Sequence, residues 1–180
     1  MSYDYSSWEP VKVKAEDLSK EEKFLLKDSE TFCIYPWIHL HSYPTGETYP
    51  CCHAEMQNSV GNNKTDSLEV IWNNPKMKEL RNDMLSSVPN KICEGCYEQE
   101  SHGFFSGRKS ANKHHGHHIA KALHTTDAGT VRDFKMTYWD IRFSNLCNLS
   151  CRSCGHIFSS SWHKDQSHLA EQAGDPNWKN

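Results

Sequence analysis

The most informative segment of the chain reads Cys147-Asn148-Leu149-Ser150-Cys151-Arg152-Ser153-Cys154. Its three cysteines have the spacing C-x₃-C-x₂-C and follow a segment with the alternation of a β-strand. Three thiolates this close in sequence can hold iron or zinc. A four-iron cluster takes one ligand for each iron, so three cysteines would leave one iron open. A small molecule can bind at that open iron and react there.

This spacing resembles the cluster loop of radical S-adenosylmethionine (SAM) enzymes. The resemblance implies that Cys147, Cys151 and Cys154 hold a [4Fe–4S] cluster and that SAM chelates the fourth iron through its amino and carboxylate groups. An electron from the cluster then splits SAM and yields a 5′-deoxyadenosyl radical. The family usually carries an aromatic residue just before the last cysteine, and this chain has Ser153 there.

Residues 136–144, directly before the loop, predict a strand. Apolar residues alternate there with more polar ones at a period of two, as on a strand with one face in a core. The inward-facing residues are expected to be Trp139, Ile141 and Phe143. Asp140 and Arg142 alternate with them, and they either face a barrel interior near SAM or form a surface or structural ion pair.

The radical SAM resemblance makes this strand the first of a partial (β/α)₆ barrel. Such folds place their chemistry in loops at the carboxyl ends of strands. A helix is expected over residues 158–168, after a turn that Gly155 permits. The other strands and helices of a barrel would have to follow Asn180, where this sequence ends. We therefore expect the chain to be a fragment or a truncated reading frame.

The composition narrows the class of protein. The chain has 180 residues, with 20 basic and 23 acidic side chains and a formal net charge of −3, so nucleic-acid binding is not expected. The hydrophobic content of 36% argues against a large core. No apolar run reaches transmembrane length and no signal-peptide pattern is present, so we expect a cytosolic protein without a membrane partner. Its eight cysteines are then expected to be metal ligands rather than disulfides.

A second group of cysteines surrounds a predicted β-hairpin. Residues 38–49 are expected to form the hairpin, closed by the turn Pro44-Thr45-Gly46-Glu47. Because a hairpin brings its two ends together, Cys33 before it and Cys51 after it should be neighbours in space. Further on, Asp66 and Ser67 are expected to cap a helical stretch that Pro75 divides in two, because proline cannot donate an interior helical hydrogen bond.

These cysteines resemble the auxiliary-cluster domains called SPASM and twitch. Cys33, Gly46 and Cys51 follow their C-x₉₋₁₅-G-x₄-C entry, and Cys93 and Cys96 match their C-x₂-C. The single-cluster twitch version is the closer match, because the further cysteines of the full SPASM pattern are absent from the sequence. The resemblance implies a [4Fe–4S] cluster saturated by four cysteines, which serves electron transfer or substrate anchoring. Burial and hydrogen bonds to sulfur would tune its potential.

Three alternatives stay open from the sequence. Cys52 could replace Cys51 as a ligand, although the Gly-x₄-Cys register favours Cys51. Four cysteines are also a common zinc set, so the chain could be a non-enzymatic cysteine-rich module that binds zinc or an iron–sulfur cluster. A third possibility is a cluster-carrying fragment that works only with a second polypeptide.

The predicted fold class is α+β, with a small twitch-like hairpin and helices followed by the first βα unit of an incomplete barrel. The expected divisions are an N-terminal arm at 1–31, an auxiliary-cluster domain at 32–100, a linker at 101–133 and the start of a radical SAM domain at 134–180. Ser19 and Glu22 form a capping-box pattern for a short helix in the arm. The histidines at 114–118 can bind metal, but a solvated linker or exposed helix is the favoured interpretation.

Taken together, the two cysteine patterns predict a radical SAM enzyme that cleaves SAM reductively and carries an auxiliary cluster. Its substrate would be a peptide, a protein or a small molecule, and its electron donor a protein such as flavodoxin or ferredoxin. The sequence assigns no general acid or base.

Overall fold

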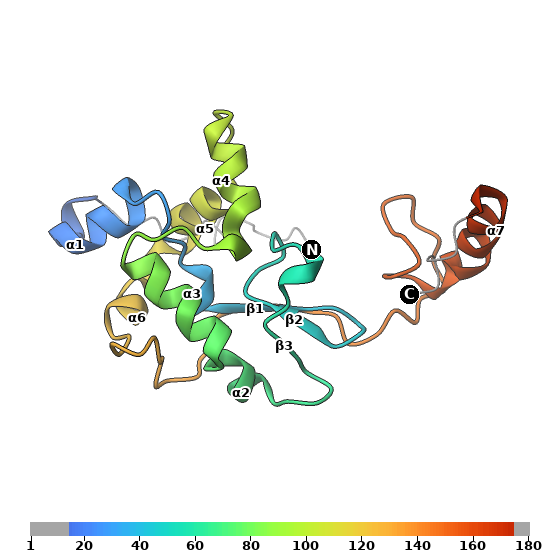
Figure 1. Ribbon diagram of the computed structural model, residues 1–180, viewed down its shortest axis with the longest axis horizontal. Helices are drawn as coiled ribbons and strands as arrows, with labels where there is room; N and C mark the ends of the chain where they lie inside the picture. The colour runs from blue at the N-terminus through green and yellow to red at the C-terminus, as the bar shows by residue number, and fades with distance from the viewer. Residues whose placement is uncertain (1–14, 175–180) are drawn as a thin grey trace, which may run out of the picture.

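The computed structural model describes residues 15–174 of the chain. Residues 1–14 of the expected N-terminal arm and residues 175–180 lie outside the described residues. Figure 1 shows a body built around a small sheet, from which the segment after β4 extends to one side. No helix of the described residues is long and apolar enough to cross a membrane.

The described residues form one sheet with the strand order β3-β2-β1-β4. Its strands are β1 (His39–Ser42), β2 (Glu47–Tyr49), β3 (Gly61–Asn62) and β4 (Tyr138–Ile141). β1 and β2 pair antiparallel, with His41 opposite Tyr49, which confirms the predicted hairpin. Gly46 in the connecting turn has a φ of 97°, a conformation that favours glycine.

The described residues also form α-helices. They are α1 (Lys20–Lys23), α2 (Leu68–Trp72), α3 (Pro75–Leu85), α4 (Glu94–Ser101), α5 (Gly107–His115), α6 (Ala120–Leu123) and α7 (His163–Ala173). Of these, α7 lies in the segment that extends away from the sheet (Figure 1). Single turns of 3₁₀-helix occur at Ala15–Asp17, Tyr35–Trp37, Met56–Asn58, Lys91–Cys93, Gly116–His118 and Ser160–Trp162, and a turn of π-helix at Phe24–Asp28.

Side-chain caps explain where several helices begin. Ser19 and Glu22 form the predicted capping box of α1. Ser67 caps α2 through the amide of Val70, as predicted. Pro75 is the first residue of α3, where its missing amide proton costs nothing, so the predicted division of the helical stretch is confirmed.

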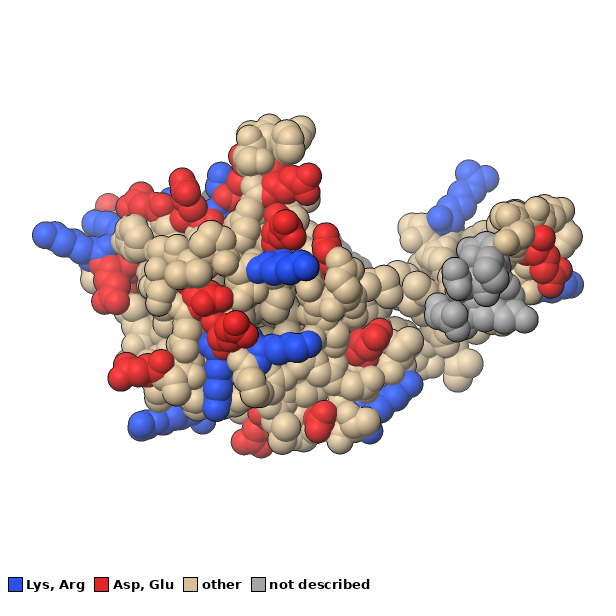
Figure 2. Space-filling model, in the orientation of Figure 1, with Lys and Arg blue, Asp and Glu red and all other residues tan. Residues whose placement is uncertain are grey.

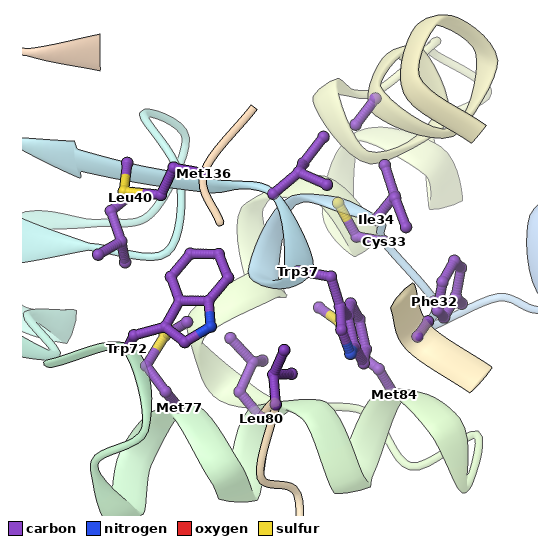
Figure 3. Packing of buried hydrophobic residues seen from close by; sticks show 14 of the residues in the cluster. Phe32, Cys33, Ile34, Trp37, Leu40, Trp72, Met77, Leu80, Met84 and Met136 are labelled. Atoms are coloured by element: carbon purple, nitrogen blue, oxygen red, sulfur yellow. The ribbon is translucent and has the colours of Figure 1, made fainter. Parts of the chain in front are cut away.

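The hydrophobic core lies between the sheet and the helices α2 and α3. Figure 3 shows Trp72, Met77, Leu80 and Met84 facing residues of the hairpin segment such as Trp37. Trp72, Leu80 and Trp37 are completely buried. Helix α3 buries residues four apart, the spacing of one helix face. This core fixes the hairpin, and with it the cysteines at the two ends of the hairpin.

The segment 101–133 is not the solvated linker that we expected. Helix α5 packs against the body, and its residues Arg108, Ala111 and Asn112 are buried. Ile119 and Ala122 after it join the hydrophobic core. Composition misled the prediction because the polar residues of α5 are buried in hydrogen bonds to backbone rather than exposed to water.

Strand β4 joins the sheet of the hairpin. It pairs parallel with β1, in a register that sets His39 opposite Tyr138 and His41 opposite Asp140. Of the three residues expected to face a core, Ile141 packs against it, but Trp139 and Phe143 are 58% and 87% exposed. The prediction is wrong for these two, because β4 is an edge strand and Phe143 lies beyond its pairing.

The helix expected over residues 158–168 begins later in the structure. A 3₁₀ turn at Ser160–Trp162 leads into α7, which ends at Gly174 in the left-handed conformation with a φ of 66°. Within the described residues, β4 and α7 are the only counterparts of the predicted barrel unit. The incomplete barrel therefore remains a prediction, as do the division of the chain into domains and the absence of nucleic-acid binding. Figure 2 shows acidic and basic side chains interspersed on the visible face.

Candidate metal centre

Four cysteines from three segments meet beside the hairpin. Cys33 lies just before the 3₁₀ turn that leads into β1, and Cys51 lies just after β2. Cys93 is the residue before α4, and Cys96 lies in the first turn of that helix. Cys33 and Cys96 are buried, and the other two are half-buried. Figure 3 shows Cys33 next to Ile34 among the core residues.

The thiols of these cysteines influence one another electrostatically. Burial raises the pKa of Cys33 well above its ordinary value, and the nearby charges of Cys51, Cys93 and Cys96 raise it further. Burial, with Cys93 and Cys96 again adding to it, also raises the pKa of Cys51. Burial together with Cys96 raises the pKa of Cys93 to about 12. Each thiol is thus within electrostatic reach of the others, which confirms that Cys33 and Cys51 are neighbours.

Backbone amides lower the pKa at three of the sulfurs, against the effect of burial. The amide of Tyr35 hydrogen-bonds to the Cys33 sulfur and lowers its pKa, and the amide of His53 does the same for Cys51. At the start of α5, the amides of Gly107 and Arg108 act in this way on Cys96. Hydrogen bonds of this kind favour the thiolate, the form that binds metal.

A buried hydroxyl lies beside the fourth sulfur. The Tyr97 hydroxyl group lowers the pKa of Cys93, so it is directed toward that thiol. The oxygen of this hydroxyl is nevertheless without a hydrogen-bond partner among residues 15–174, so the two groups do not reach hydrogen-bond geometry. A buried donor without an acceptor is costly.

The four thiols do not have the spacing of a single-ion site. Among residues 15–174, no three side chains of Cys, His, Asp or Glu are arranged to hold one metal ion. A tetrahedral zinc ion with zinc–sulfur bonds of about 2.3 Å needs sulfurs only about 3.8 Å apart. The histidines of the 114–118 run form no such group either, and His115 instead stacks on Tyr138 with ring centroids 5.3 Å apart.

Cys52 lies outside this group of four. Its side chain is more exposed than that of Cys51. Burial raises the pKa of Cys52, with Asp140 as the next cause, whereas Arg142 lowers it. Cys52 therefore faces the charged residues of β4 and its end more than it faces the other thiols.

The cysteines of the 147–154 loop are more exposed than those beside the hairpin. Cys147 and Cys154 are half-buried and Cys151 is exposed. The amide of Cys154 donates to the carbonyl of Cys151 at 3.0 Å, which forms a turn, and the amide of Leu149 lies 3.4 Å from the Cys147 sulfur. As with the hairpin cysteines, no three described side chains in this loop are arranged to hold a single metal ion.

Residues 159–162 close the loop through hydrogen bonds that the sequence did not reveal. The hydroxyl of Ser161 donates to the carbonyl of Cys147 at 2.7 Å, and the hydroxyl of Ser159 donates to that of Leu149 at 2.7 Å. The indole of Trp162 donates to the carbonyl of Cys151 at 3.0 Å. The sequence predicts these residues to begin a helix, and their side-chain contacts lack a sequence signal.

A charged and aromatic contact joins the loop to the sheet. The guanidinium of Arg142 lies 4.2 Å from the ring centroid of Phe158, which in turn stacks on Tyr43 at 5.7 Å. Arg142 also lies 3.7 Å from the carboxylate of Asp140. An ion pair, one of the two alternatives for these residues, is therefore present.

Comparison with known proteins identifies the hairpin segment. Residues 33–97 match the SPASM family, an iron–sulfur cluster-binding domain. The match begins at Cys33 and ends one residue after Cys96, so it spans all four clustered cysteines. It supports a SPASM/twitch domain here, and domains of this family occur in radical SAM enzymes. Neither the curated proteins nor the solved structures gave a match for the chain.

Proposed function

We propose that the chain is an iron–sulfur protein of the radical SAM class, in which Cys33, Cys51, Cys93 and Cys96 hold an auxiliary [4Fe–4S] cluster. The observation that carries this proposal is the mutual proximity of four thiols inside the residues that match an iron–sulfur domain. Without metal, burial makes these thiols hard to ionise. Coordination removes that cost, because a metal-bound thiol is deprotonated.

The surroundings of the thiols fit such a group. Backbone amides such as those of Tyr35 and His53 already donate to the sulfurs, and hydrogen bonds to sulfur are a means by which proteins tune the potential of a cluster. The buried Tyr97 hydroxyl lacks an acceptor, and a metal-bound sulfur near Cys93 would provide one.

We further propose that Cys147, Cys151 and Cys154 hold a second [4Fe–4S] cluster, whose open iron binds SAM. When bound, this cluster would supply the electron for reductive cleavage of SAM. The cysteine spacing and the exposure of Cys151 to solvent support this assignment.

The sheet separates the two cysteine groups. Because β1 and β4 are parallel neighbours, Cys33 before β1 and the loop cysteines after β4 lie at opposite ends of this strand pair. We propose that the auxiliary cluster either anchors the substrate or passes electrons. The substrate would be a peptide or protein, with a small molecule as the alternative, and a flavodoxin or ferredoxin would donate the electron.

Anaerobic reconstitution with iron and sulfide, followed by optical and EPR spectroscopy, tests the proposal. We expect about eight irons per chain, since each cluster holds four, and an EPR signal that changes when SAM is added. The matched variant Cys147→Ala should lose the SAM-sensitive signal and keep the other. A colourless protein loaded with zinc would refute the proposal.

A non-enzymatic cluster-binding module is the second candidate function. One observation favours it: the hairpin cysteines lie within the residues that match an iron–sulfur domain, and the loop cysteines lie outside them. Such a module would take up one cluster, or structural zinc, and would not respond to SAM. Iron, zinc and sulfide analysis of the same reconstituted protein separates the two candidates.

A further inference from the structure

One side chain of α5 holds the backbone on both sides of Cys33. The amide oxygen of Asn112 accepts a hydrogen bond from the backbone nitrogen of Ile34 at 3.0 Å. The amide nitrogen of Asn112 donates to the carbonyl of Phe32 at 2.9 Å. Asn112 is 7% exposed, so both bonds are formed away from water. Although α5 lies outside the matched residues 33–97, it thus fixes the position of the first cysteine in the match.

Arg108, one helical turn before Asn112, joins three segments. Arg108 donates to the carbonyls of Ser29 and Phe32 at 2.9 and 3.0 Å. On its other side, the Arg108 Nε donates to Glu100 at 2.8 Å, and Nη2 forms a further bond with the same carboxylate. Glu100 lies on α4, one turn after Cys96. Arg108 is only 5% exposed, so it connects the Cys33 segment to the helix of the other cysteines from within the protein.

The guanidinium also brings a positive charge close to the thiols. Its bond to the carbonyl of Phe32 places it one residue from Cys33, and it is ion-paired with Glu100 on α4. Loss of this positive charge would leave the carboxylate unpaired, and a more negative surrounding disfavours the added electron of a reduced cluster. Arg108 can therefore act both through its hydrogen bonds and through its charge, whereas neutral Asn112 can act only through its hydrogen bonds.

We propose that Arg108 and Asn112 are positioning residues of the auxiliary cluster: Asn112 fixes Cys33, and Arg108 joins the ligand segments and keeps the cluster easier to reduce. This inference rests on the proposed function of the four cysteines. It extends the cluster site beyond the matched domain into α5.

The electrostatic part is tested by the reduction potential of the auxiliary cluster. For this measurement Cys147, Cys151 and Cys154 of the full chain are replaced by alanine, so that only the auxiliary cluster is observed. Arg108→Gln should make the potential more negative, with at least a tenfold fall in the ratio of reduced to oxidised cluster at a fixed potential, which is 59 mV for one electron. Arg108→Lys keeps the charge and should shift it much less. Lys113→Gln, which removes an exposed charge from the same helix, should leave it unchanged.

The geometric part is tested by the rate at which a chelator removes iron. Asn112→Ala should speed iron release several-fold while the potential stays at the wild-type value. Should this variant fail to fold, as judged by circular dichroism, Asn112→Asp replaces it, because the carboxylate keeps the acceptor for Ile34 and loses only the donor to Phe32. Wild-type potential in Arg108→Gln together with wild-type iron release in the Asn112 variant would overturn the inference and leave the proposed function standing.

Alkylation of the metal-free protein separates failure of the inference from failure of the proposed function. Cys33 is 6% exposed and should react slowly with iodoacetamide, as followed by mass spectrometry. Asn112→Ala should label Cys33 several-fold faster, and Lys113→Gln should not. If the wild-type chain takes up no cluster, the proposed function and the redox role fail, and unchanged labelling of Cys33 would overturn the positioning role as well.

Discussion

His41 donates a 2.8 Å hydrogen bond from Nδ1 to the carboxylate of Asp140, across the parallel pair β1–β4. His41 is 2% exposed, and its other ring nitrogen is buried without a partner among the described residues. Asp140 also lies 3.7 Å from Arg142, which contacts the segment after the cysteine loop through Phe158. This bond therefore links the hairpin beside the candidate metal centre to the strand that precedes the loop.

Loss of this bond should destabilise the protein. Asp140→Ala leaves the buried imidazole without an acceptor, which should cost about 1–3 kcal/mol of unfolding free energy. Asp140→Asn keeps an oxygen acceptor and should cost less. Urea denaturation measures both, with Asp127→Ala at an exposed position as the control. Equal stability of Asp140→Ala and the wild type would show that the bond contributes nothing.

The stability of the fold should fall in mild acid because of His39. Burial lowers the pKa of His39 to about 4, the neighbouring His41 and His115 lower it as well, and the Tyr138 carbonyl and Asp140 oppose the shift. Below pH 6.5 His39 becomes protonated in the unfolded chain but stays neutral in the folded chain. The unfolding free energy should therefore fall by up to about 1.4 kcal/mol per pH unit until the pH approaches the folded-state value.

Urea denaturation at pH 7, 6 and 5 measures this dependence. His39→Gln should reduce the slope, and His124→Gln, at an exposed position, should keep it. Some slope should remain in His39→Gln, because burial and His117 also lower the pKa of His118 to about 4. Identical slopes for His39→Gln and the wild type would contradict the assignment.

Two adjacent cysteines should differ in their effect on the auxiliary cluster. Cys51 interacts with Cys93 and Cys96 above all, whereas Cys52 interacts mainly with Asp140 and Arg142. In the reconstituted chain, Cys51→Ser should therefore lose about four irons, the content of one cluster. Cys52→Ser should retain them. The reverse result would make Cys52 the ligand.

A glycine beside α3 should tolerate no side chain. Gly129 has a φ of 74°, and an added Cβ would lie 2.3 Å from the carbonyl oxygen of Lys78. Gly103 has a φ of 80°, and its Cβ would meet nothing within 4 Å. Gly103→Ala should thus cost only the left-handed strain, about 1–2 kcal/mol, and Gly129→Ala clearly more. Thermal unfolding of the two variants compares them, and equal losses would exclude the close contact.

Local signals in the sequence predicted much of the hairpin domain. The capping pair Ser19 and Glu22, the Gly46 turn and the dividing Pro75 each act through neighbouring residues, so their effects can be inferred without the rest of the fold. The proximity of Cys33 and Cys51 follows from the hairpin alone. These predictions succeeded because each depends on short-range geometry.

The predictions that failed depended on long-range contacts. Arg108 and Asn112 are polar, and only their carbonyl and amide partners at residues 29–34 explain why they are buried. The alternation of apolar and polar residues on β4 indicates two faces but does not indicate which of them packs against the core. The rings of His39 and His115 cover Tyr138, whereas Trp139 stays exposed at the sheet edge.

The central claim is that the four cysteines around the hairpin bind a [4Fe–4S] cluster. The most direct test is iron, zinc and sulfide analysis, with EPR, of the full chain in which Cys147, Cys151 and Cys154 are replaced by alanine and which is reconstituted without oxygen. We predict about four irons and four sulfides per chain, with an EPR signal that SAM does not alter. One zinc ion without sulfide, or no bound metal, would contradict the claim.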